Sequence, residues 1–544
     1  MQSAKRIAIV GAGPMAIYTI KELIKSDFPL NITAFESSDT PGCGMPYRRR
    51  MNADYMFCNA YSKEIPPVTR RLVTWLHDQD DDTLAHFGLD RDGIDSRSFY
   101  PRVLIGNFLA DELRALCDQG RAQGHQVAIL PLHTVVNIAP DEGGVFVDGT
   151  TLDGEFRQVF DDVVLATGHS WPKSPRIGSA DLISPWPYTA VTELEPGNIG
   201  ILGSSLSAID VIVALGTEHG TFHEAEDAVT WFPKKGRESV SVTMVSHLGI
   251  MPEPDFFYAY PYEPLTHIHP DAVQAEINVG ADGLLARVFG LLIAELDHVA
   301  PDYMSRLGSG VRTLNGFADA YFADRVNTGG MRALRETLAS SVESMRQKRT
   351  QSHRYALLRA HENFEALFAH FNSEDWDSFR ANLLNVFSDC YAAIPHLSVR
   401  RVLAMHDAGV LRIIPTGEDS DFRNGENGTV ISTTVDGDIA FDALIDARGQ
   451  AAAPLSALPF PSLIAGLSQN NAPLHAPFRL ELLNNCSGRV YCLSMPQLLQ
   501  TNPFSQGLAN CHELGKTVAN DIVTVLETTR SDPQPASRFE KSTC

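Results

Sequence analysis

The chain begins with a short apolar run that leads into a glycine turn and then into helical spacing. Residues 5–10 form the run, and residues 11–16 (GAGPMA) form the turn. This is the G-x-G-x-x-G/A pattern of a strand, tight turn and helix that bind a dinucleotide. In such turns the first glycine makes the bend, the second lets the backbone approach a pyrophosphate, and the last small residue lets the helix pack on the strand. The predicted binding residues of this turn are Gly11, Gly13, Pro14, Met15 and Ala16.

A second apolar run, residues 31–35, ends at the acidic residue Glu36. An acidic residue at a strand end about 20 residues beyond the glycines is placed to accept hydrogen bonds from a ribose 2′-OH. Glu36 is therefore a predicted cofactor ligand, and an ordinary exposed strand end is the alternative interpretation.

A third apolar run, residues 160–166, ends in a turn of small residues at Thr167 and Gly168. Here the chain resembles flavoproteins with two dinucleotide-binding domains, which carry an Ala-Thr-Gly strand end close to the cofactor. The resemblance implies that Thr167 and Gly168 line the cofactor site.

A second strand, turn and helix follow at residues 198–210. The segment looks like the G-x-G-x-S-G-x-D motif of flavin-containing monooxygenases, with Gly203, Ser207 and Asp210 in the positions of the first glycine, the serine and the acid. Ser205 replaces the second glycine, and its Cβ is expected to crowd a pyrophosphate. Gly203, Ser204, Ser205 and Ser207 are predicted to bind NAD(P)H, and a fold half that binds nothing is the alternative.

The chain repeats one order of elements. A helical stretch at 107–124, a strand at 126–130 and the strand before Gly168 are echoed by residues 397–408, 410–414 and 441–449. Between them, apolar residues at helical spacing predict an insertion whose stripe is core, with no chemistry assigned to it. The stripe comprises Leu284, Leu285, Val288, Phe289, Leu292 and Leu296. The predicted division is a first α/β dinucleotide-binding domain at 1–195 and 450–527, a second at 196–270 and 392–449, a helical insertion at 271–391, and a disordered tail at 528–544.

Composition narrows the classes of partner. The net charge of −22 over 544 residues argues against nucleic acid and anionic membrane surfaces. No apolar stretch reaches about 18 residues, and no signal peptide is visible, so a cytoplasmic protein is expected. Eight cysteines without a C-x-x-C pair argue against a dithiol reductase. His267 and His269 have no third ligand in view, so no metal is expected.

Further blocks of sequence point to a family. Residues 42–47 (GCGMPY), 59–67, 98–106 and the two turns together resemble a bacterial family of FAD/NAD(P)-binding proteins. That family includes flavin-dependent urate hydroxylases and nitrosuccinate-forming L-aspartate N-monooxygenases. The resemblance implies FAD, NAD(P)H and a peroxyflavin that hydroxylates a small polar nitrogen-containing metabolite. A homodimer is one expectation, because such flavoproteins commonly form them.

The resemblance also implies site residues. Gly44 is expected beside the cofactor and Asn59 near the reactive edge of the flavin, with a loop-capping role as the alternative for Asn59. Arg102 is expected to hold a flavin phosphate or a substrate carboxylate, or else to form a structural salt bridge. Gly507 precedes a predicted helix whose N-terminus is expected to point at the flavin. The aromatic stretch 256–262 either walls a substrate pocket or packs in the core.

Which turn holds which cofactor is predicted from how completely each turn matches the glycine motif. The imperfect second turn is the better nicotinamide candidate, so the first is expected to hold FAD. His247 follows the second strand of that fold where NADPH sites usually offer an arginine, and Lys234, Lys235 and Arg237 are another source of positive charge. Two other hypotheses remain open: an FAD-dependent reductase that inserts no oxygen, and a regulatory protein with a decayed nicotinamide site.

Overall fold

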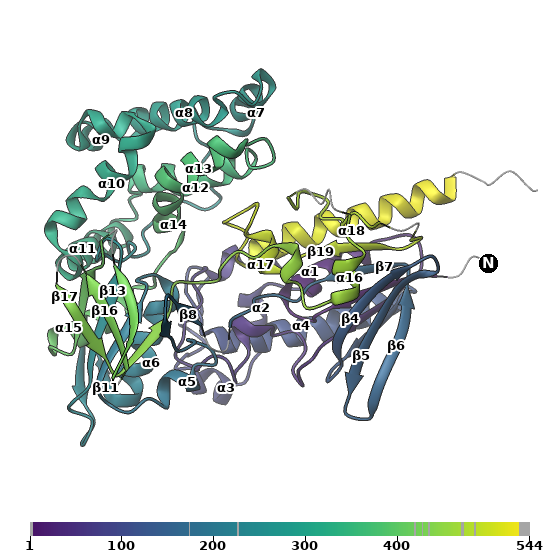
Figure 1. Ribbon diagram of the computed structural model, residues 1–544, viewed down its shortest axis with the longest axis horizontal. Helices are drawn as coiled ribbons and strands as arrows, with labels where there is room; N and C mark the ends of the chain where they lie inside the picture. The colour runs from purple at the N-terminus through teal and green to yellow at the C-terminus, as the bar shows by residue number, and fades with distance from the viewer. Residues whose placement is uncertain are drawn as a thin grey trace, which may run out of the picture.

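The structure is a computed structural model. It describes residues 4–172, 175–225, 228–417, 420–426, 428–433, 436–468, 473–483 and 486–531. Figure 1 shows two α/β bodies side by side, with a group of helices above one of them.

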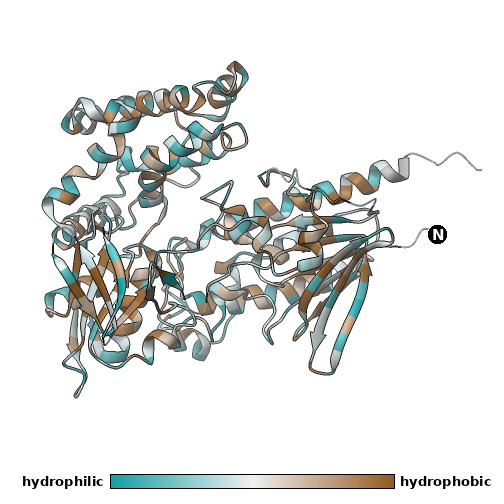
Figure 2. Ribbon diagram, in the orientation of Figure 1, coloured by the Kyte–Doolittle hydropathy of each residue, from teal (hydrophilic) through white to brown (hydrophobic). Residues whose placement is uncertain are grey.

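The first dinucleotide fold is built on a five-stranded sheet in the order β19-β7-β1-β2-β3, with every pairing parallel. The strands are β1 (Lys5–Val10), β2 (Leu30–Phe35), β3 (Gln126–Leu130), β7 (Asp162–Leu165) and β19 (Arg489–Cys492). Their near-continuous apolar sequences suit strands that are covered on both faces. Figure 2 shows the hydrophobic residues gathered on these strands.

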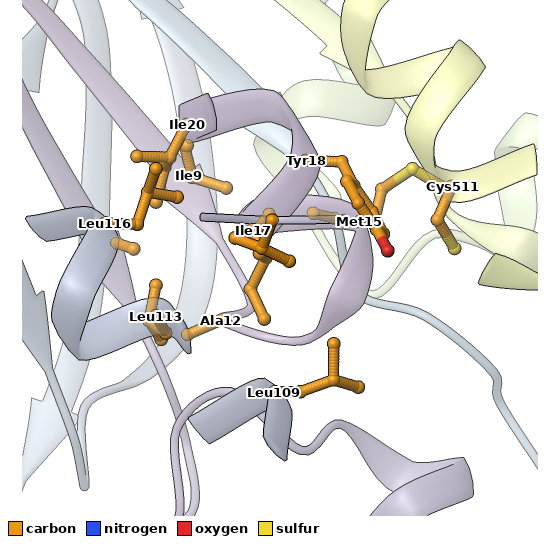
Figure 3. Packing of buried hydrophobic residues seen from close by; sticks show 14 of the residues in the cluster. Ile9, Ala12, Met15, Ile17, Tyr18, Ile20, Leu109, Leu113, Leu116 and Cys511 are labelled. Atoms are coloured by element: carbon orange, nitrogen blue, oxygen red, sulfur yellow. The ribbon is translucent and has the colours of Figure 1, made fainter. Parts of the chain in front are cut away.

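Helices cover one face of this sheet and a small antiparallel sheet covers the other. The helices are α1 (Pro14–Leu23), α4 (Arg102–Ala122) and α18 (Leu508–Ser531). The antiparallel strands are β4 (Thr134–Asp141), β5 (Gly144–Thr151) and β6 (Gly154–Phe160). In Figure 3, Ile17 and Ile20 of α1 lie toward Leu113 and Leu116 of α4, whereas Tyr18 lies beside Cys511 of α18. This packing holds the N-terminus of α1 at the carboxyl edge of the sheet.

The second dinucleotide fold has a four-stranded parallel sheet in the order β14-β13-β10-β18. Its strands are β10 (Asn198–Leu202), β13 (Ser241–Ser246), β14 (Leu411–Pro415) and β18 (Ala443–Asp446). The helices packed on it are α6 (Leu206–His219) and α15 (His396–Asp407). Two antiparallel groups complete it: β11 (Gly220–Glu224) with β12 (Val229–Pro233), and β15 (Asp421–Gly425), β16 (Gly428–Thr433) and β17 (Gly437–Phe441).

The helical insertion separates β13 from α15. Its helices are α7 (Pro270–Val279), α8 (Leu284–Val299), α9 (Pro301–Leu307), α10 (Leu314–Thr328), α11 (Gly330–Gln347), α12 (Ser352–Glu365), α13 (Ser373–Asn382) and α14 (Leu384–Tyr391). The predicted apolar stripe on α8 is buried in the core of the insertion. Phe504, which precedes α18, packs into the same core and ties the insertion to the first fold.

Short elements complete the described chain. They are α2 (Leu72–His77), α3 (Asp81–His86), α5 (Thr189–Thr192), α16 (Pro461–Ala465), α17 (Met495–Leu498), β8 (Arg176–Ile177) and β9 (Ala180–Asp181). None of the helices in the described part of the chain combines the length and apolar character that a membrane crossing requires.

The predicted α/β class with a helical insertion is confirmed, with small differences at the ends of elements. The first helix begins at Pro14 rather than after the turn, because proline suits the first position of a helix. Helix α18 continues to Ser531, so the predicted disordered tail from residue 528 starts too early. Residues 532–544 lie outside the described part of the chain.

Candidate functional site

A cavity of about 1930 Å³ lies where both dinucleotide folds and the helical insertion meet. Its walls include residues that follow β1, β2 and β7 in the first fold, the turn before α6 in the second, and one face of α12. In open parallel sheets, ligands bind outside the carboxyl ends of the strands. The cavity therefore occupies the position where this architecture places a cofactor.

The first glycine turn requires glycine at its bend and leaves little space beside its second glycine. Gly11 has a φ of +101°, and a Cβ there would stand 2.3 Å from the Ala166 carbonyl oxygen. Gly13 caps α1 in extended conformation, and a Cβ on it would lie 3.1 Å from the Cα of Gly44. Gly11, Gly13 and Gly44 all line the cavity. The backbone is thus bare where a pyrophosphate would approach.

The other predicted residues of this turn divide between the cavity and the core. Pro14 and Met15 line the cavity at the start of α1. Ala16 is fully buried in the apolar cluster behind the turn. Ala16 therefore serves the close packing of helix on strand, as its position in the motif predicts.

The second turn makes the same two backbone contacts as the first turn. Gly203 has a φ of +116°, and a Cβ there would lie 2.7 Å from the Ala447 carbonyl oxygen. Ala447 donates its N–H to Leu202, as Ala166 does to Val10 in the first fold. The duplication that the sequence echo predicts is therefore present in the backbone itself.

Ser205 stands where Gly13 stands in the first turn. It caps α6 with a φ of −98°, close to the −85° of Gly13, so the backbone accepts a side chain at this position. Ser205 is exposed, and it lines the cavity with Ser207. Gly203 and Ser204 are not among the residues that line it.

The residue at the carboxyl end of the second strand differs between the two folds. Glu36 lines the cavity and accepts hydrogen bonds from the Ala12 N–H at 3.1 Å and the Ser38 N–H at 2.9 Å. The two registers, Val10 opposite Phe35 and Leu202 opposite Val245, make Ser246 the counterpart of Glu36. At this position the second fold therefore has a serine instead of a carboxylate. A carboxylate there would repel a 2′-phosphate.

Basic residues proposed from the sequence lie elsewhere. Lys234 donates to the carbonyls of Thr217 and Glu218 at the C-terminal end of α6, and Arg237 pairs with Glu195. Neither they nor Lys235 line the cavity. The expectation that they supply charge to a nicotinamide cofactor is wrong, because α6 separates them from the turn at Ser205.

Thr167, Gly168 and Gly507 line the cavity together. Gly168 has a φ of +70°, and its carbonyl accepts the Met495 N–H at 3.1 Å. The Thr167 hydroxyl lies 2.7 Å from that of Ser494. Gly507, with a φ of +115°, immediately precedes α18, so the N-terminus of that helix opens on the cavity. Three segments distant in sequence therefore meet at one edge of the sheet.

Asn59 also lines the cavity, and so does Asn52, which the sequence analysis missed. The Asn52 side chain is 1% exposed, and its Nδ2 donates to the carbonyls of Met45 at 3.0 Å and Arg48 at 3.3 Å. Those two bonds fix which way the amide faces. An asparagine inside a loop carries no periodic or spacing signal, so no sequence pattern could have selected it.

Arg102 adopts the structural role that the sequence left as an alternative. Its Nη1 lies 2.6 Å from Oδ2 of Asp210 on α6, and both side chains are largely buried. Burial raises the pKa of the Asp210 carboxyl, and the guanidinium charge of Arg102 opposes that shift. Arg102 also lines the cavity, so contact with a flavin phosphate or a substrate carboxylate stays a prediction, although the charge of Arg102 is already matched by Asp210.

The helical insertion supplies a wall of the cavity, although no chemistry was predicted for it. Helix α12 turns one face to the cavity, which carries Arg354, Leu358, Arg359, His361, Glu362 and Glu365. The detectable signal was polar residues recurring at helical spacing beside an apolar face. The sequence could not show what these polar residues face, because the rest of the cavity is formed by other parts of the chain.

The aromatic stretch from Phe256 onward both packs and walls the cavity. Phe256 and Tyr258 are buried, yet both line the cavity with Tyr262. Oε1 of Glu64 accepts hydrogen bonds from the hydroxyls of Tyr258 at 2.5 Å and Tyr262 at 2.9 Å. These bonds join the insertion side of the cavity to the first fold.

Carboxyl groups give this side of the cavity its electrostatic character. Burial raises the pKa of Glu365 to about 7, although the Asn502 amide donates to Oε2 at 2.8 Å; nearby Glu362 raises it further. Burial also raises the pKa of Asp255 to about 7, with the charge of Glu64 adding to the effect. Burial lowers the pKa of His361 to about 4, so this imidazole is neutral at pH 7. Helix α12 also places Arg354 and Arg359 in this wall, but Arg354 pairs with Glu253 and Arg359 with Glu362. Glu365 is therefore the carboxyl group of this helix face that no lysine or arginine among the described residues pairs with, and its negative charge grows as pH rises through 7.

Known proteins resemble this chain along its whole length. A protein of Escherichia coli (strain K12) named Uncharacterized protein YdhS is 36% identical over 541 residues, which is 99% of each chain. The chain belongs to the YdhS family. The FAD-NAD(P)-binding family model matches residues 8–170, and the YdhS-like middle domain model matches residues 269–391.

Solved structures show the same fold. The reduced form of ornithine hydroxylase (PvdA) from Pseudomonas aeruginosa has a TM-score of 0.50 at 14% identity, covering 96% of this chain and 100% of its own. An ornithine N-hydroxylase from Kutzneria sp. 744 has a TM-score of 0.49 at 14% identity, covering 97% and 100%. The predicted cofactors, FAD and NAD(P)H, and an FAD/NAD(P)-binding flavoprotein family are confirmed by the family match, whereas grouping with urate hydroxylases and L-aspartate N-monooxygenases stays a prediction. YdhS-family membership and the FAD-NAD(P)-binding match show a protein that binds FAD and NAD(P).

Proposed function

We propose that this protein is an NAD(P)H-dependent FAD monooxygenase that hydroxylates a nitrogen atom of a small, positively charged metabolite. The observation that carries the proposal is the cavity itself. Both glycine turns reach it, and the Glu365 carboxyl group of α12 lies in its opposite wall. One space can therefore bring two dinucleotides and a small cation together.

In this proposal the first turn holds FAD and the second holds NAD(P)H. Bound FAD would supply hydride acceptance and oxygen activation. The bare backbone at Gly11, Gly13 and Gly44 fits a pyrophosphate, and Glu36 stands where a ribose hydroxyl would lie. Ser205 and Ser207 open α6 toward the same cavity, with free N–H groups that favour phosphate.

The substrate class follows from the charge of the insertion side. Glu365 on α12 presents a carboxyl group to the cavity whose described hydrogen-bond partner is the neutral Asn502 amide, and a protonated amine is its natural complement. Phe256, Tyr258 and Tyr262 would exclude water around it. The similarity of the fold to ornithine hydroxylase from Pseudomonas aeruginosa and the sequence resemblance to aspartate N-monooxygenases support chemistry at nitrogen. Urate hydroxylation would instead require an anion site.

The test is substrate-dependent oxygen insertion. The purified yellow protein is incubated with NADPH or NADH, ¹⁸O₂ and a panel of diamines, amino acids and purines. We expect a cationic amine to stimulate oxygen uptake and to gain one labelled oxygen at nitrogen. Hydride transfer without label in any product would favour the reductase hypothesis. A colourless protein that added FAD cannot reconstitute would leave only the regulatory one.

Glu365→Gln provides a pH test of the cation subsite. Because burial raises the pKa of Glu365 to about 7, its anionic form grows as pH rises through 7, so amine binding should strengthen over that range. Glutamine should remove this pH dependence and raise KM for the best amine about 10–100-fold at pH 8, the loss expected for a charge-assisted hydrogen bond. Initial rates from pH 6 to pH 8 check it. Glu155→Gln, on an exposed strand position, is the control; equal profiles in all three proteins would contradict the subsite.

Gly203→Val tests the second turn. A side chain there would meet the Ala447 carbonyl at a strained φ, so we expect NADP⁺ binding to weaken at least about tenfold while FAD stays bound. Isothermal titration of NADP⁺ into the yellow protein measures the change. Gly143→Ala, which meets no neighbouring atom, is the matched control. Unchanged NADP⁺ affinity in Gly203→Val would contradict the assignment of NAD(P)H to this turn.

A further inference from the structure

Arg102 and Asp210 connect the two dinucleotide folds through a buried ion pair. Arg102 is the first residue of α4 in the first fold, and Asp210 lies near the start of α6 in the second. Their side chains are 15% and 11% exposed, and Nη1 is 2.6 Å from Oδ2. Charges at this depth attract each other far more strongly than at the surface, and neither tolerates losing the other.

The backbone of Arg102 is hydrogen-bonded to a segment that packs on the second fold. The Arg102 N–H donates to the Met56 carbonyl at 2.8 Å. Met56 and Ala53 are buried in the core of the second fold, in the same apolar cluster as Ile209 of α6. The ion pair therefore lies at the edge of a packed interface rather than across open solvent.

This interface has further ties on both sides of the ion pair. Tyr188, although it precedes β10 in the chain, packs against the apolar core of the second fold, and its N–H donates to the Met51 carbonyl at 3.2 Å. Nη1 of Arg401, on α15, donates to the Tyr55 carbonyl at 3.2 Å. The segment of the first fold from Met51 to Met56 is thus held at both ends, and the ion pair adds a strongly directional contact to the start of α6.

We propose that Arg102 and Asp210 are positioning residues that set the distance and angle between the NAD(P)H turn and the FAD turn. Ser205 and Ser207, which open the same helix as Asp210, line the shared cavity. A shift of α6 would carry that turn, and with it the nicotinamide, away from the flavin. Hydride transfer is steeply sensitive to such a shift, since a displacement of about 1 Å can cost about 100-fold in rate. The inference rests on the cofactor placement proposed above.

The experiment compares the wild type with the double variant Arg102→Gln/Asp210→Asn, which removes both charges and leaves neither one buried alone. Anaerobic stopped-flow mixing with NADPH measures flavin reduction. We expect reduction to slow about 100-fold, while FAD content and the rate at which O₂ reoxidises dithionite-reduced protein stay unchanged. A merely structural role would lower FAD content or alter both half-reactions together.

A distance measurement provides a readout that does not depend on turnover. Spin-labelled noncanonical amino acids replace Leu152 in the first fold and Phe232 in the second, both of which are exposed. Pulsed electron paramagnetic resonance should give a narrow distance distribution in the wild type and a broader or shifted one in the double variant. Asp210→Glu, which keeps the charge, should recover part of the reduction rate that Asp210→Asn loses.

An exposed ion pair serves as the matched control. Arg335 of α11 and Asp407 of α15 are each more than half exposed, so Arg335→Gln/Asp407→Asn should change neither the rate nor the distances. The inference is overturned if Arg102→Gln/Asp210→Asn reduces its flavin at the wild-type rate with an unchanged distance distribution. Because substrate and O₂ are absent from the reductive measurement, a failure to hydroxylate amines would leave this result standing. A wild-type flavin that neither NADPH nor NADH reduces would instead refute the proposed cofactor placement, with the distances still reporting on the ion pair.

Discussion

Replacing Gly13 with valine should yield a folded protein that has lost its FAD. The backbone at Gly13 is extended, so valine is tolerated there without strain in φ. The Cβ of the new side chain would lie 3.1 Å from the Cα of Gly44. The valine methyl groups would then occupy the space through which the pyrophosphate approaches the turn. Overpacking of this kind costs about 1–3 kcal/mol, which corresponds to FAD binding about 10–100-fold weaker.

The measurement is the flavin released per mole of protein on denaturation, with affinity from titration of the apoprotein with FAD. Gly290→Ala is the control, because Gly290 is exposed on α8 and an added methyl group meets nothing. That variant should keep its FAD. If Gly13→Val copurifies with FAD at the wild-type ratio and affinity, the pyrophosphate does not pass this turn, and the assignment of FAD to the first fold is wrong.

Asp389→Ala should destabilise the helical insertion by about 3–5 kcal/mol, the cost of leaving one member of a buried ion pair without its partner. Asp389 is paired with Arg325 through two hydrogen bonds, at 3.0 and 2.7 Å. The Tyr321 hydroxyl donates to the same carboxylate at 2.6 Å. Both charged side chains are nearly buried, so the alanine variant leaves the Arg325 guanidinium in the core of the insertion without the carboxylate that pairs with it.

Urea denaturation followed by hydrogen exchange checks this expectation and locates the loss. Protection should fall in α10 and α14, which carry Arg325 and Asp389, and remain in the first dinucleotide fold. The apolar pair Arg325→Met/Asp389→Leu should recover much of the stability, because it leaves no charge without a partner. Arg335→Ala, which breaks an exposed pair, should cost at most about 1 kcal/mol. A similar loss in both single variants would show that burial of the pair is not what matters.

The first dinucleotide fold was predictable because its signals are local. The bend at Gly11 needs a positive φ and a bare Cα, and both requirements appear directly as glycine in the sequence. The repeat of helix, strand and closing strand likewise identified the second fold, and the backbone contacts of Gly203 match those of Gly11. Helical spacing indicated the insertion without any knowledge of its neighbours.

The roles of single polar residues were not predictable in the same way. Arg102 looked like a ligand for a phosphate until the structure placed Asp210 beside it. The basic cluster around Lys234 lay near the second fold in sequence, yet it binds the far end of α6. In each case the deciding partner comes from a distant segment or from the opposite end of a helix, and no spacing rule encodes that distance.

The sequence by itself determined the class of fold, the two glycine turns and the flavoprotein family, because these depend on backbone requirements and periodicity that each residue expresses locally. Only the tertiary structure decided which side chains share the cavity. Helix α12 of the insertion faces the two turns with Glu362 and Glu365, and loop 256–262 closes the wall between them. Those residues acquire their electrostatic character from burial and from one another's charge, which exist only after the three parts of the chain have packed together.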